Sequence, residues 1–475
     1  MVDNYPEEPL QPPWPKPKPY TSNIFRRLAR GWKSWFGLLN EWDFRVSLGE
    51  LNLLGKRVFL VNDPLLVRKV LVDEVDLFPK HPYTLWILEP LIGRAIFSVN
   101  GEEWAIQRRL IDQAFQVANL KKAFPAMTAA TSSLLHRLEM NGVDSFVDID
   151  KEMTMVAADV IIRTILSRPI EGDEATDIFK AFSRYQRHAG RALVLRFLRL
   201  PKSLIQLSLK DDAKVIRNWI QAFIHERLEQ NKVDERNPLE KIDFLDTLIM
   251  AEDPKTKKKF SEQDLVDQVC FLFLAGHETS ASSLGIAAWL LARSPEVQKQ
   301  MRVEVMSVVC DRPIHSMLRF DELRQLPYSE AVFNEALRLY PPVSFFIRDR
   351  DKKDGELATS EGRRRCPVGS LLTLSPWVIQ RHDKYWPEPH QFKPERFLKN
   401  SSSLQRNAFL PFGMGPRKCP GASFAKQEAL LVLAELVRRY ELLPVTDQDP
   451  DFVGLLTVRS QNGIRLRLRE LEHKT

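Results

Sequence analysis

The stretch Phe412-Gly-Met-Gly-Pro-Arg-Lys-Cys-Pro-Gly421 decides the fold of this chain, and a helical run from Ala422 to Tyr440 follows it. Gly415 and Gly421 allow backbone conformations and close approaches that a Cβ atom would block. Cys419 is predicted to lie at the start of the helix, where unpaired amides and the helix dipole favour a thiolate over a thiol. One cysteine cannot hold zinc or an iron–sulfur cluster, whereas one thiolate is sufficient as the axial ligand of haem iron.

Five residues of this stretch, Phe412, Gly415, Arg417, Cys419 and Gly421, fit the pattern F-x-x-G-x-R-x-C-x-G at every specified position. The chain therefore resembles the cytochrome P450 superfamily, whose haem-binding signature has this form. A structural cysteine in a glycine turn, the simpler alternative, would leave the other four matches unexplained. The resemblance implies haem b with Cys419 as its axial iron ligand and Arg417 bonded to a haem propionate. It places three more residues against the haem: Phe412, Gly413 and Gly421.

A second match, Glu335-Ala-Leu-Arg338, has the family's E-x-x-R form. A separation of three residues puts both side chains on one face of a helix, where they form an ion pair. Exposed pairs of this kind are common and weak, so the spacing alone says little. Pro394-Glu-Arg-Phe397 follows and offers Arg396 as the third member of the Glu-Arg-Arg cluster that the resemblance implies. In the family this cluster braces the fold behind the haem, so its expected role is structural.

A third match, Trp104-Ala-Ile-Gln-Arg108, resembles the family's W-x-x-x-R. The resemblance implies that Trp104 and Arg108, one helical turn apart, reach a haem propionate. Without the other motifs, the simpler interpretation is an amphipathic helix with its Trp directed inward and its Arg outward. Arg348, which lies beyond the helix-ending pair Pro341-Pro342, is a further candidate to bind a propionate.

Ala275-Gly-His-Glu-Thr-Ser280 resembles the family's oxygen-activation motif, A/G-G-x-E/D-T-T/S. The resemblance implies that this motif lies on the long helix that crosses the distal haem face, with Ala275 and Gly276 against the haem. Gly276 is expected to let the helix widen locally beside the iron. Thr279 is expected to hydrogen-bond the oxygen ligand, and Glu278 to complete a proton route with water.

The same segment belongs to the longest apolar stretch of the chain, Val269 to Ala292. Ser261 followed by Asp264 forms a capping pattern that predicts the start of this helix, and Ser294-Pro295 predicts its end. Polar residues near the middle would be costly in lipid, so the stretch is interpreted as a helix buried in protein rather than a membrane span. His277 is one of these residues and is interpreted as a core or interface histidine rather than a ligand.

The composition is that of an ordinary globular protein, because the 475 residues are 44% hydrophobic and 28% charged, with a net charge of +7. These values exclude a disordered or coiled-coil chain, and the net charge is too small for a nucleic-acid-binding surface. The cysteines form no CxxC pair, which argues against a zinc site and a disulfide framework and fits a reducing compartment. They are Cys270, Cys310, Cys366 and Cys419.

Residues 1–21 are rich in proline and are predicted to be an extended segment, without a signal peptide or a membrane span. Residues 22–475 are predicted to form one domain that is mainly α with small β-sheets. At its start, Ser22 to Asn40 is expected to be an amphipathic helix packed on the core, with docking on a membrane surface as the alternative. Helix is expected with few breaks from Pro64 to about Gln230. Strands are expected in four runs: Phe44 to Leu48, Arg57 to Val61, Leu371 to Val378 and Ile464 to Leu468.

The resemblance implies the cytochrome P450 fold, a single triangular domain with haem b between the Thr279 helix and the Cys419 loop. It also implies a monooxygenase, which inserts one oxygen atom from O₂ into a C–H bond. The run E-A-L-R-L-Y-P-P resembles the fatty-acid and eukaryote-like branch of the family, although the N-terminus is typical of a soluble bacterial enzyme. The segments expected to line the pocket are largely apolar and favour a lipophilic small molecule. These segments are Tyr83 to Ile92, Leu272, Val343 to Phe346 and Gly454 to Val458.

Electrons are expected from a separate ferredoxin- or flavodoxin-type donor with its NAD(P)H reductase, because no nucleotide- or flavin-binding signature is found. The basic residues on and after the Cys419 loop would form a docking patch for an acidic donor, or else a solvated helix face. They are Lys418, Lys426, Arg438 and Arg439. We expect a cytoplasmic monomer that binds no nucleic acid, with peripheral membrane contact as an alternative. A peroxide-driven or isomerase-type haem-thiolate enzyme and a haem-thiolate sensor are the rival functions. Glu278 and Thr279 count against the sensor, which needs no proton route.

Overall fold

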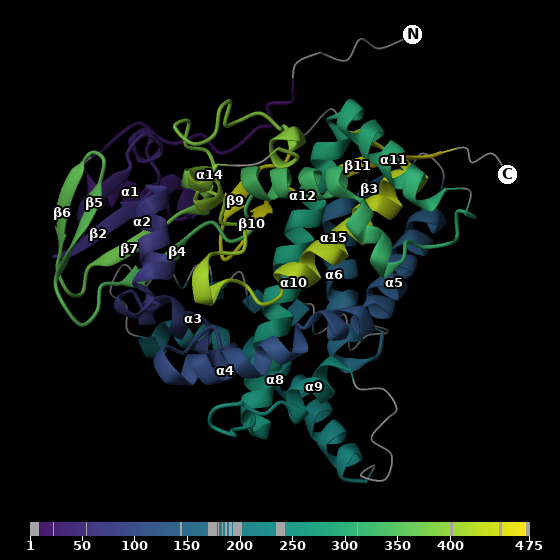
Figure 1. Ribbon diagram of the computed structural model, residues 1–475, viewed down its shortest axis with the longest axis horizontal. Helices are drawn as coiled ribbons and strands as arrows, with labels where there is room; N and C mark the ends of the chain where they lie inside the picture. Colours follow the sequence, from purple (N-terminus) through teal and green to yellow (C-terminus); the bar gives the residue numbers. More distant parts are fainter. Residues whose placement is uncertain are drawn as a thin grey trace. The chain divides into compact units, whose positions relative to one another are not determined.

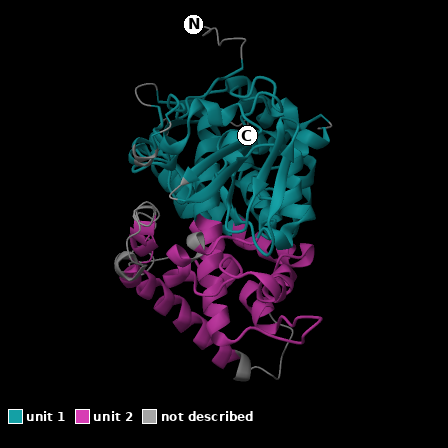
Figure 2. Cartoon of the chain, turned by 90° about the vertical axis from the view of Figure 1, so that its left-hand side faces the viewer, with its two compact units in different colours: residues 1–78, 128–157, 278–475 teal, residues 79–127, 158–277 magenta. Residues whose placement is uncertain are grey.

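The computed structural model shows a mainly helical chain with small β-sheets, as the sequence predicts (Figure 1). It describes residues 9–21, 23–53, 55–142, 145–169, 202–233, 243–310, 312–399, 402–445 and 449–471, and within 170–201 it describes residues 178, 180–182, 184, 185, 188, 189 and 192. The chain divides into two compact units, which Figure 2 shows in different colours. Unit 1 holds residues 1–78, 128–157 and 278–475, and unit 2 holds residues 79–127 and 158–277.

The long helix predicted from the capping pattern is α10 (Glu262–Ala292), and parts of it belong to both units. The backbone N–H of Ser261 donates to Asp264 Oδ2 at 2.9 Å, and the N–H of Asp264 donates to Ser261 Oγ at 3.2 Å. These two bonds satisfy amides that the first turn leaves unpaired. From Val269 to Ala292 the helix is almost wholly buried, so the interpretation as a core helix is confirmed.

Unit 1 contains the other helices that matter for the site. Proline at the first helical position starts both α11 (Pro295–Val309) and α12 (Pro327–Leu339). All but one of the residues of α12 from Tyr328 to Leu339 are buried, which makes it a central helix of the unit. The remaining helices of the unit include α1 (Ile24–Arg30), α2 (Pro64–Arg68), α13 (Pro376–Ile379), α14 (Ser403–Asn407) and α15 (Ala422–Arg439).

Among the described residues of unit 2, the named elements are helices, joined by turns and loops. Tyr185 is buried there and donates its hydroxyl to the carbonyl of Ile87 at 3.0 Å. Arg217 on α8 (Lys202–Val233) donates to the carbonyl of Leu91 at 2.8 Å and to Asp267 Oδ1 on α10 at 2.7 Å. These bonds join α8 to the helix that contains Leu91 and to α10. Besides α8, the helices that lie entirely in this unit include α3 (Pro82–Ile92), α4 (Gly101–Ala114) and α9 (Phe244–Met250). Both α5 (Val117–Met140) and α6 (Ile149–Leu166) contribute residues to both units.

The strands of the described residues belong to unit 1 and form four small sheets. The largest has the order β1-β2-β7-β4, in which β2 and β7 are parallel and the other neighbours are antiparallel. Its strands are β1 (Leu48–Leu53), β2 (Lys56–Val61), β7 (Leu371–Leu374) and β4 (Phe346–Asp349). The others are β5 (Gly355–Thr359) with β6 (Gly362–Cys366), β9 (Phe452–Gly454) with β10 (Val458–Ser460), and the sheet β3 (Ser145–Asp148), β11 (Arg465–Glu470) and β8 (Tyr440–Pro444). A hydrophobic cluster that includes Phe59, Leu66, Phe78 and Leu374 fills the space beside the largest sheet.

The N-terminal segment is extended where the structure describes it, and it is bonded to unit 1. The carbonyl of Leu10 accepts from the N–H of Phe392 at 2.8 Å, and Tyr340 donates its hydroxyl to the carbonyl of Pro13 at 2.5 Å. Trp14 stacks on His390 with ring centroids 4.6 Å apart. Among the described residues, none of the helices is both long and apolar enough to cross a membrane.

Three local predictions from sequence were wrong. The segment 22–40 is not one helix, because α1 ends at Arg30 and a short 3-10 helix follows at Trp35–Leu38. A Cβ on Gly37 would lie 2.0 Å from the carbonyl oxygen of Arg30, so the chain folds back here at a glycine. The first strand is Leu48–Leu53 rather than Phe44 to Leu48, because Phe44 ends a 3-10 helix that starts at Glu41. The run from Leu371 is a strand only to Leu374, after which Pro376 starts α13.

Candidate active site

The Cys419 loop is held by its own backbone. The N–H of Cys419 donates to the carbonyl of Phe412 at 2.9 Å, which closes the loop on itself. Gly413 and Gly415 have φ of 71° and 72°, which favours glycine at both positions. A Cβ on Gly415 would lie 2.1 Å from the carbonyl oxygen of Leu71, so this loop approaches a neighbouring backbone more closely than any other residue would allow. The loop leaves Cys419 exposed on unit 1.

The helix after this loop begins slightly later than the sequence suggests. The first helical residue of α15 is Ala422, with Gly421 at the N-cap, so Cys419 lies three positions before the helix. The amides of the first turn still lie just after the thiol in the chain, where the positive end of the helix favours a negatively charged ligand. Cys419 therefore has the local setting of a thiolate rather than that of a buried, inert cysteine.

Two arginines of unit 1 are desolvated close to one another. Burial and, to a smaller extent, the charge of Arg417 together lower the pKa of Arg348 to about 10. Burial also lowers the pKa of Arg417 to about 10, although Asp76 opposes this change. Arg348 donates through Nη1 to the carbonyl of Ile347 at 3.0 Å, but its buried Nε has no hydrogen-bond partner among the described residues. A buried cation and a partly buried one that repel one another favour an anion between them.

The motif from Ala275 to Ser280 lies on α10, and the expected local widening of the helix is absent. The backbone is α-helical without interruption from Glu262 to Ala292. A Cβ on Gly276 would lie 2.4 Å from Cδ1 of Ile161 on α6, so the space that the glycine creates is filled by a side chain of the protein. His277 is buried against the rings of Phe182 and Phe273, which agrees with its interpretation as a core residue.

Glu278 has a partner that no sequence motif indicated. Its carboxylate accepts two hydrogen bonds from Arg459, at 2.9 and 2.6 Å, and one from the hydroxyl of Thr457 at 2.9 Å. Thr279 follows on the same helix and is half-buried, and its carbonyl accepts from Ser283 at 2.7 Å. The two residues of the motif therefore have different surroundings: Glu278 is buried in an ion pair, whereas Thr279 is half-buried.

A second buried acid, Glu428 on α15, was also missed from the sequence. Ser280 donates its hydroxyl to Glu428 Oε2 at 2.6 Å, which joins α10 to α15. Burial raises the pKa of Glu428 to about 8, and the bond from Ser280 only partly opposes this rise. Its other oxygen has no hydrogen-bond partner among the described residues, so a neutral carboxyl is the form that this site favours.

Because its pKa is raised in the folded protein, Glu428 makes stability depend on pH. The folded protein keeps the Glu428 proton up to about pH 8, whereas the unfolded chain releases it near the ordinary pKa of 4.5. The free energy of unfolding therefore falls as the pH rises between these two values. This fall amounts to at most about 1.4 kcal/mol per pH unit, and we expect Glu428→Gln to remove it. The melting temperature of the variant relative to wild type should rise between about pH 6 and about pH 8. Glu330→Gln, which removes a surface acid paired with Lys426, should leave the slope unchanged.

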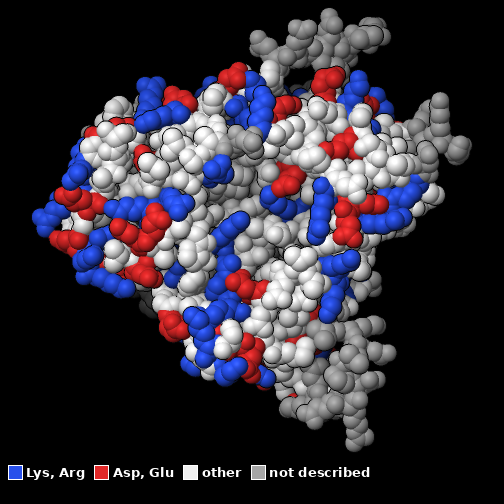
Figure 3. Space-filling view, viewed as in Figure 1, with Lys and Arg blue, Asp and Glu red and all other residues white. Residues whose placement is uncertain are grey.

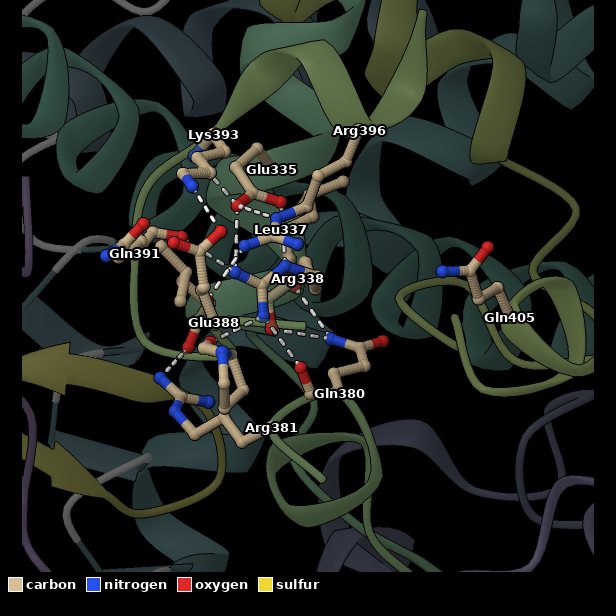
Figure 4. A network of polar contacts seen from close by, with 12 residues as sticks. Glu335, Leu337, Arg338, Gln380, Arg381, Glu388, Gln391, Lys393, Arg396 and Gln405 are labelled. Carbon is tan, nitrogen blue, oxygen red and sulfur yellow. Dashed lines mark hydrogen bonds and ion pairs between the residues drawn. The ribbon is translucent and has the colours of Figure 1, made fainter. Parts of the chain in front are cut away.

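The side chains of Glu335 and Arg338 on α12 form a hydrogen-bonded cluster with that of Arg396 (Figure 4). Arg338 donates to both oxygens of Glu335, at 2.7 and 2.8 Å, and Arg396 donates to Glu335 Oε1 at 3.2 Å. Three carbonyls accept the remaining bonds of the Arg338 guanidinium, at 2.8 to 3.0 Å, and they belong to Gln380, Pro389 and Gln391. Glu335 and Arg338 are fully buried, so the pair that the spacing predicts is an internal one.

Comparison with known proteins identifies the family. A family model described as Cytochrome P450 matches residues 12–466 of the chain. This chain belongs to the cytochrome P450 family. As a member, it is a cytochrome P450 monooxygenase, and its cofactor is haem b.

Individual relatives agree with this assignment. Cytochrome P450 4A6 of Oryctolagus cuniculus is 30% identical over 436 residues, which cover 88% of this chain and 82% of that protein. A Sus scrofa protein named taurochenodeoxycholic 6 alpha-hydroxylase is 28% identical, with the same coverage of both chains. Among solved structures, the haem domain of cytochrome P450DA has a TM-score of 0.77 at 22% identity and covers 90% of each chain. The likeness in structure shows that the fold is that of a cytochrome P450.

Unit 1 fits the haem of a cytochrome P450 in two independent respects. Its Cys419 loop presents an exposed sulfur, and haem iron requires one axial thiolate in this family. Its buried Arg348, with one guanidinium nitrogen that has no hydrogen-bond partner among the described residues, lies near the partly buried Arg417, and a haem propionate carries the charge and the acceptor oxygens that a guanidinium binds best. One cysteine sulfur and two arginines therefore suit haem b rather than a metal ion without a porphyrin.

The other residues expected to contact the haem lie in unit 2. Trp104 and Arg108 are one turn apart on α4, as their spacing predicts, and Ala275 and Gly276 lie on the part of α10 that belongs to this unit. Arg108 donates from Nε to both oxygens of Asp112, at 2.8 and 2.9 Å. A propionate would compete with Asp112 for this guanidinium.

The basic docking patch predicted after the Cys419 loop is wrong in part. Arg438 and Arg439 are buried and pair with Glu435 on the same helix, so they cannot face an electron donor. Lys426 pairs with Glu330 at 2.5 Å, whereas Lys418 is exposed. Lys and Arg are interspersed with Asp and Glu on the face that Figure 3 shows. Helical periodicity from sequence could not reveal which face of α15 is buried, because the helix is buried almost all round.

Proposed function

We propose that this protein hydroxylates a lipophilic small molecule with O₂ and with electrons from a separate redox protein. The observation that carries the proposal is the exposed Cys419 thiol on its glycine loop, in the same unit as the buried Arg348 and the partly buried Arg417. When bound, haem b supplies the chemistry of oxygen activation and C–H oxidation. The protein supplies the axial ligand, the position of the haem and the protons.

Each residue has a defined part in this proposal. Cys419 binds the haem iron as a thiolate, and Arg348 and Arg417 each hold a propionate through charge-assisted hydrogen bonds. Glu335, Arg338 and Arg396 are structural and brace the loop region without contacting substrate. The remaining residues against the haem are Trp104, Arg108, Ala275, Gly276, Phe412, Gly413 and Gly421.

The proton route uses Glu278 and Thr279. With haem in place, the Thr279 hydroxyl would act as the hydrogen-bond donor toward the site of oxygen activation, and the Glu278 carboxyl would take up protons from water and pass them on. A peroxide-driven enzyme or an isomerase has no use for such a route. The presence of an adjacent acid and alcohol on α10 therefore favours an O₂-dependent reaction.

A lipophilic substrate is supported by two observations. The chain segments expected at the pocket are mainly apolar in sequence, and apolar burial is the main source of affinity for such ligands. One relative is named taurochenodeoxycholic 6 alpha-hydroxylase. The test is to titrate a library of fatty acids, terpenoids, steroids and polyketides, together with polar molecules of similar size, into the ferric protein and record the Soret band. A blue shift reports displacement of the iron-bound water, and hits confined to polar molecules would refute the substrate class.

The Thr279→Ala variant separates the monooxygenase from its peroxide-driven rival. We expect it to bind haem and substrate and to consume reductant, but to form about tenfold less product per reductant oxidised, because a proton donor to the oxygen is lost. The missing oxygen should appear as hydrogen peroxide. Ser283→Ala removes a hydroxyl one turn along α10 that, among the described residues, bonds the carbonyl of Thr279 alone, and it should keep wild-type coupling. Equal coupling in Thr279→Ala, with full activity on peroxide alone, would favour the rival.

A further inference from the structure

The helices α3 and α8 line a cavity of about 400 Å³ within unit 2, together with the first turn of α10. Glu89 and Pro90 come from α3, Gln263 comes from α10, and α8 supplies the rest of the described lining. The volume is within the range of about 300–1,000 Å³ that pockets for small molecules have, but such pockets are mostly apolar. In the described lining of this cavity, Pro90 alone has no polar side chain. The cavity therefore suits a polar ligand.

The lining residues of α8 lie on one face of that helix. Each is three or four residues from another member of the set, which is the spacing of neighbours on a helical face. All of them can donate hydrogen bonds, because their side chains are amides or cations. They are Gln206, Lys210, Lys214, Arg217, Asn218 and Gln221.

Two residues of this face hold α3 in place. Pro90 has no N–H, so it leaves the carbonyl of Trp86 without its helical bond, and Gln206 donates its amide to that carbonyl at 2.9 Å. Arg217 donates to the carbonyl of Leu91, the next-to-last residue of α3, at 2.8 Å. Its second nitrogen is paired with an acid on α10. Both side chains are thus engaged in packing α8 against its neighbours.

Lys210 and Lys214 lie between Gln206 and Arg217 on this face but take no part in the packing. Among the described residues, neither ammonium group forms an ion pair or a hydrogen bond, and both side chains are exposed. Like charges four residues apart on a helix repel one another. Glu89 is the one acid of the described lining, so the two lysines leave an excess of positive charge here. An anion bound between the lysines would remove their repulsion.

A phosphate group matches these donors better than a carboxylate does. It carries about 1.5–2 negative charges at neutral pH and three acceptor oxygens, enough for two ammonium groups and an amide at once. Asn218 and Gln221 continue the same face of α8 and offer amide N–H groups. Lysine binds phosphate as a flexible point charge. The cavity is also larger than a phosphate group, which leaves space for an organic part beside it.

We propose that this cavity binds a phosphate group, either free or as part of a small phosphate ester, and that Lys210 and Lys214 hold it. Asn218 and Gln221 donate further hydrogen bonds to its oxygens. The site lies wholly in unit 2 and contains none of the residues assigned to haem binding or to oxygen activation. The inference therefore goes beyond the proposed function and does not depend on it.

The first test measures binding of glycerol 3-phosphate to the haem-loaded protein by titration calorimetry at constant ionic strength. We expect Lys210→Gln and Lys214→Gln each to weaken binding about tenfold, and the double variant about a hundredfold, because each removes a charged hydrogen-bond donor. Lys214→Arg keeps a cation that binds phosphate and should retain most of the affinity. Both lysines are exposed and bond to none of the described residues, so the unliganded variants should melt like wild type.

A matched control separates a built site from general attraction to a basic protein. Lys255 and Lys259 are also four residues apart, exposed and in unit 2, but they are not in the lining of the cavity. The double variant Lys255→Gln with Lys259→Gln removes the same charge and should bind glycerol 3-phosphate like wild type. Glu89→Gln should act in the opposite direction and strengthen binding severalfold, because it removes the acid of the lining.

Inorganic phosphate and succinate complete the experiment. Tighter binding of glycerol 3-phosphate than of inorganic phosphate identifies an ester as the ligand, and the reverse order identifies free phosphate; either result supports the site. Saturating ligand should also raise the melting temperature of wild type, but not that of Lys210→Gln with Lys214→Gln. The inference is overturned if neither phosphate compound binds saturably, if the Lys255 and Lys259 control loses as much affinity as the cavity variant, or if succinate binds as tightly as both phosphates. None of these results bears on haem binding or turnover.

Discussion

Replacing Cys419 with histidine is expected to abolish the red-shifted absorption that a haem-thiolate protein shows when its ferrous form binds carbon monoxide. The band requires a sulfur ligand, and an imidazole does not give it. The Cys419 loop has a fixed backbone, so histidine at this position can still hold haem while the signature is lost completely. The measurement is the difference spectrum of the reduced protein with and without carbon monoxide, together with the haem content of each variant.

The other cysteines provide the controls for this experiment. Cys270 and Cys366 are buried, and burial raises the pKa of both thiols, that of Cys270 to about 12. Neither is therefore suited to bind iron as a thiolate. Cys366→Ala and Cys310→Ala should keep the full band. If Cys419→Ala kept the band and Cys366→Ala lost it, the assignment of the axial ligand would be wrong.

Arg338→Ala is expected to be the most destabilising single substitution in unit 1 away from the haem ligand. It leaves Glu335 fully buried without its main partner, and it removes the donor to three carbonyls. Breaking one side of a buried, hydrogen-bonded ion pair costs about 3–5 kcal/mol. We expect a lower melting temperature and poor haem retention, measured by thermal unfolding and by the ratio of haem to protein absorbance.

A pair with the same spacing on the surface gives the matched control. Arg319 and Glu322 are also three residues apart, but 73% of the Arg319 side chain is exposed and the contact is 3.7 Å long. Arg319→Ala should therefore change the free energy of unfolding by about 0–1 kcal/mol. A stable, haem-replete Arg338→Ala protein would contradict the role of the cluster as a brace.

Much of the site could be predicted because its information is local in the sequence. The capping pattern of Ser261 and Asp264 and the pair Glu335 and Arg338 each involve residues three positions apart. The positive φ values of Gly413 and Gly415 concern single residues in one loop. Helix geometry and steric limits on the backbone apply to any chain, so such features are visible before it folds.

Predictions failed where local pattern and tertiary environment disagree. Phe44 to Leu48 has the composition of a strand, but Phe44 ends a 3-10 helix whose first turn has the capping pair Asn40 and Asp43. Arg438 and Arg439 have the charge of a surface patch, but both are buried against Glu435. Gly276 has the freedom to distort a helix, but Ile161 fills the space beside it. In each case a neighbour that is distant or unrecognised in the sequence decides the outcome.

By itself, the sequence determined the mainly helical class, the glycine loop with Cys419 and the acid and alcohol on α10. Only the tertiary structure decided which charges surround these residues. Glu278 and Arg459 are 181 positions apart, and Ser280 and Glu428 are 148 positions apart. Contacts at such separations follow no sequence period. The desolvation that lowers the pKa of Arg348 to about 10 and raises that of Glu428 to about 8 arises only when distant segments exclude water together.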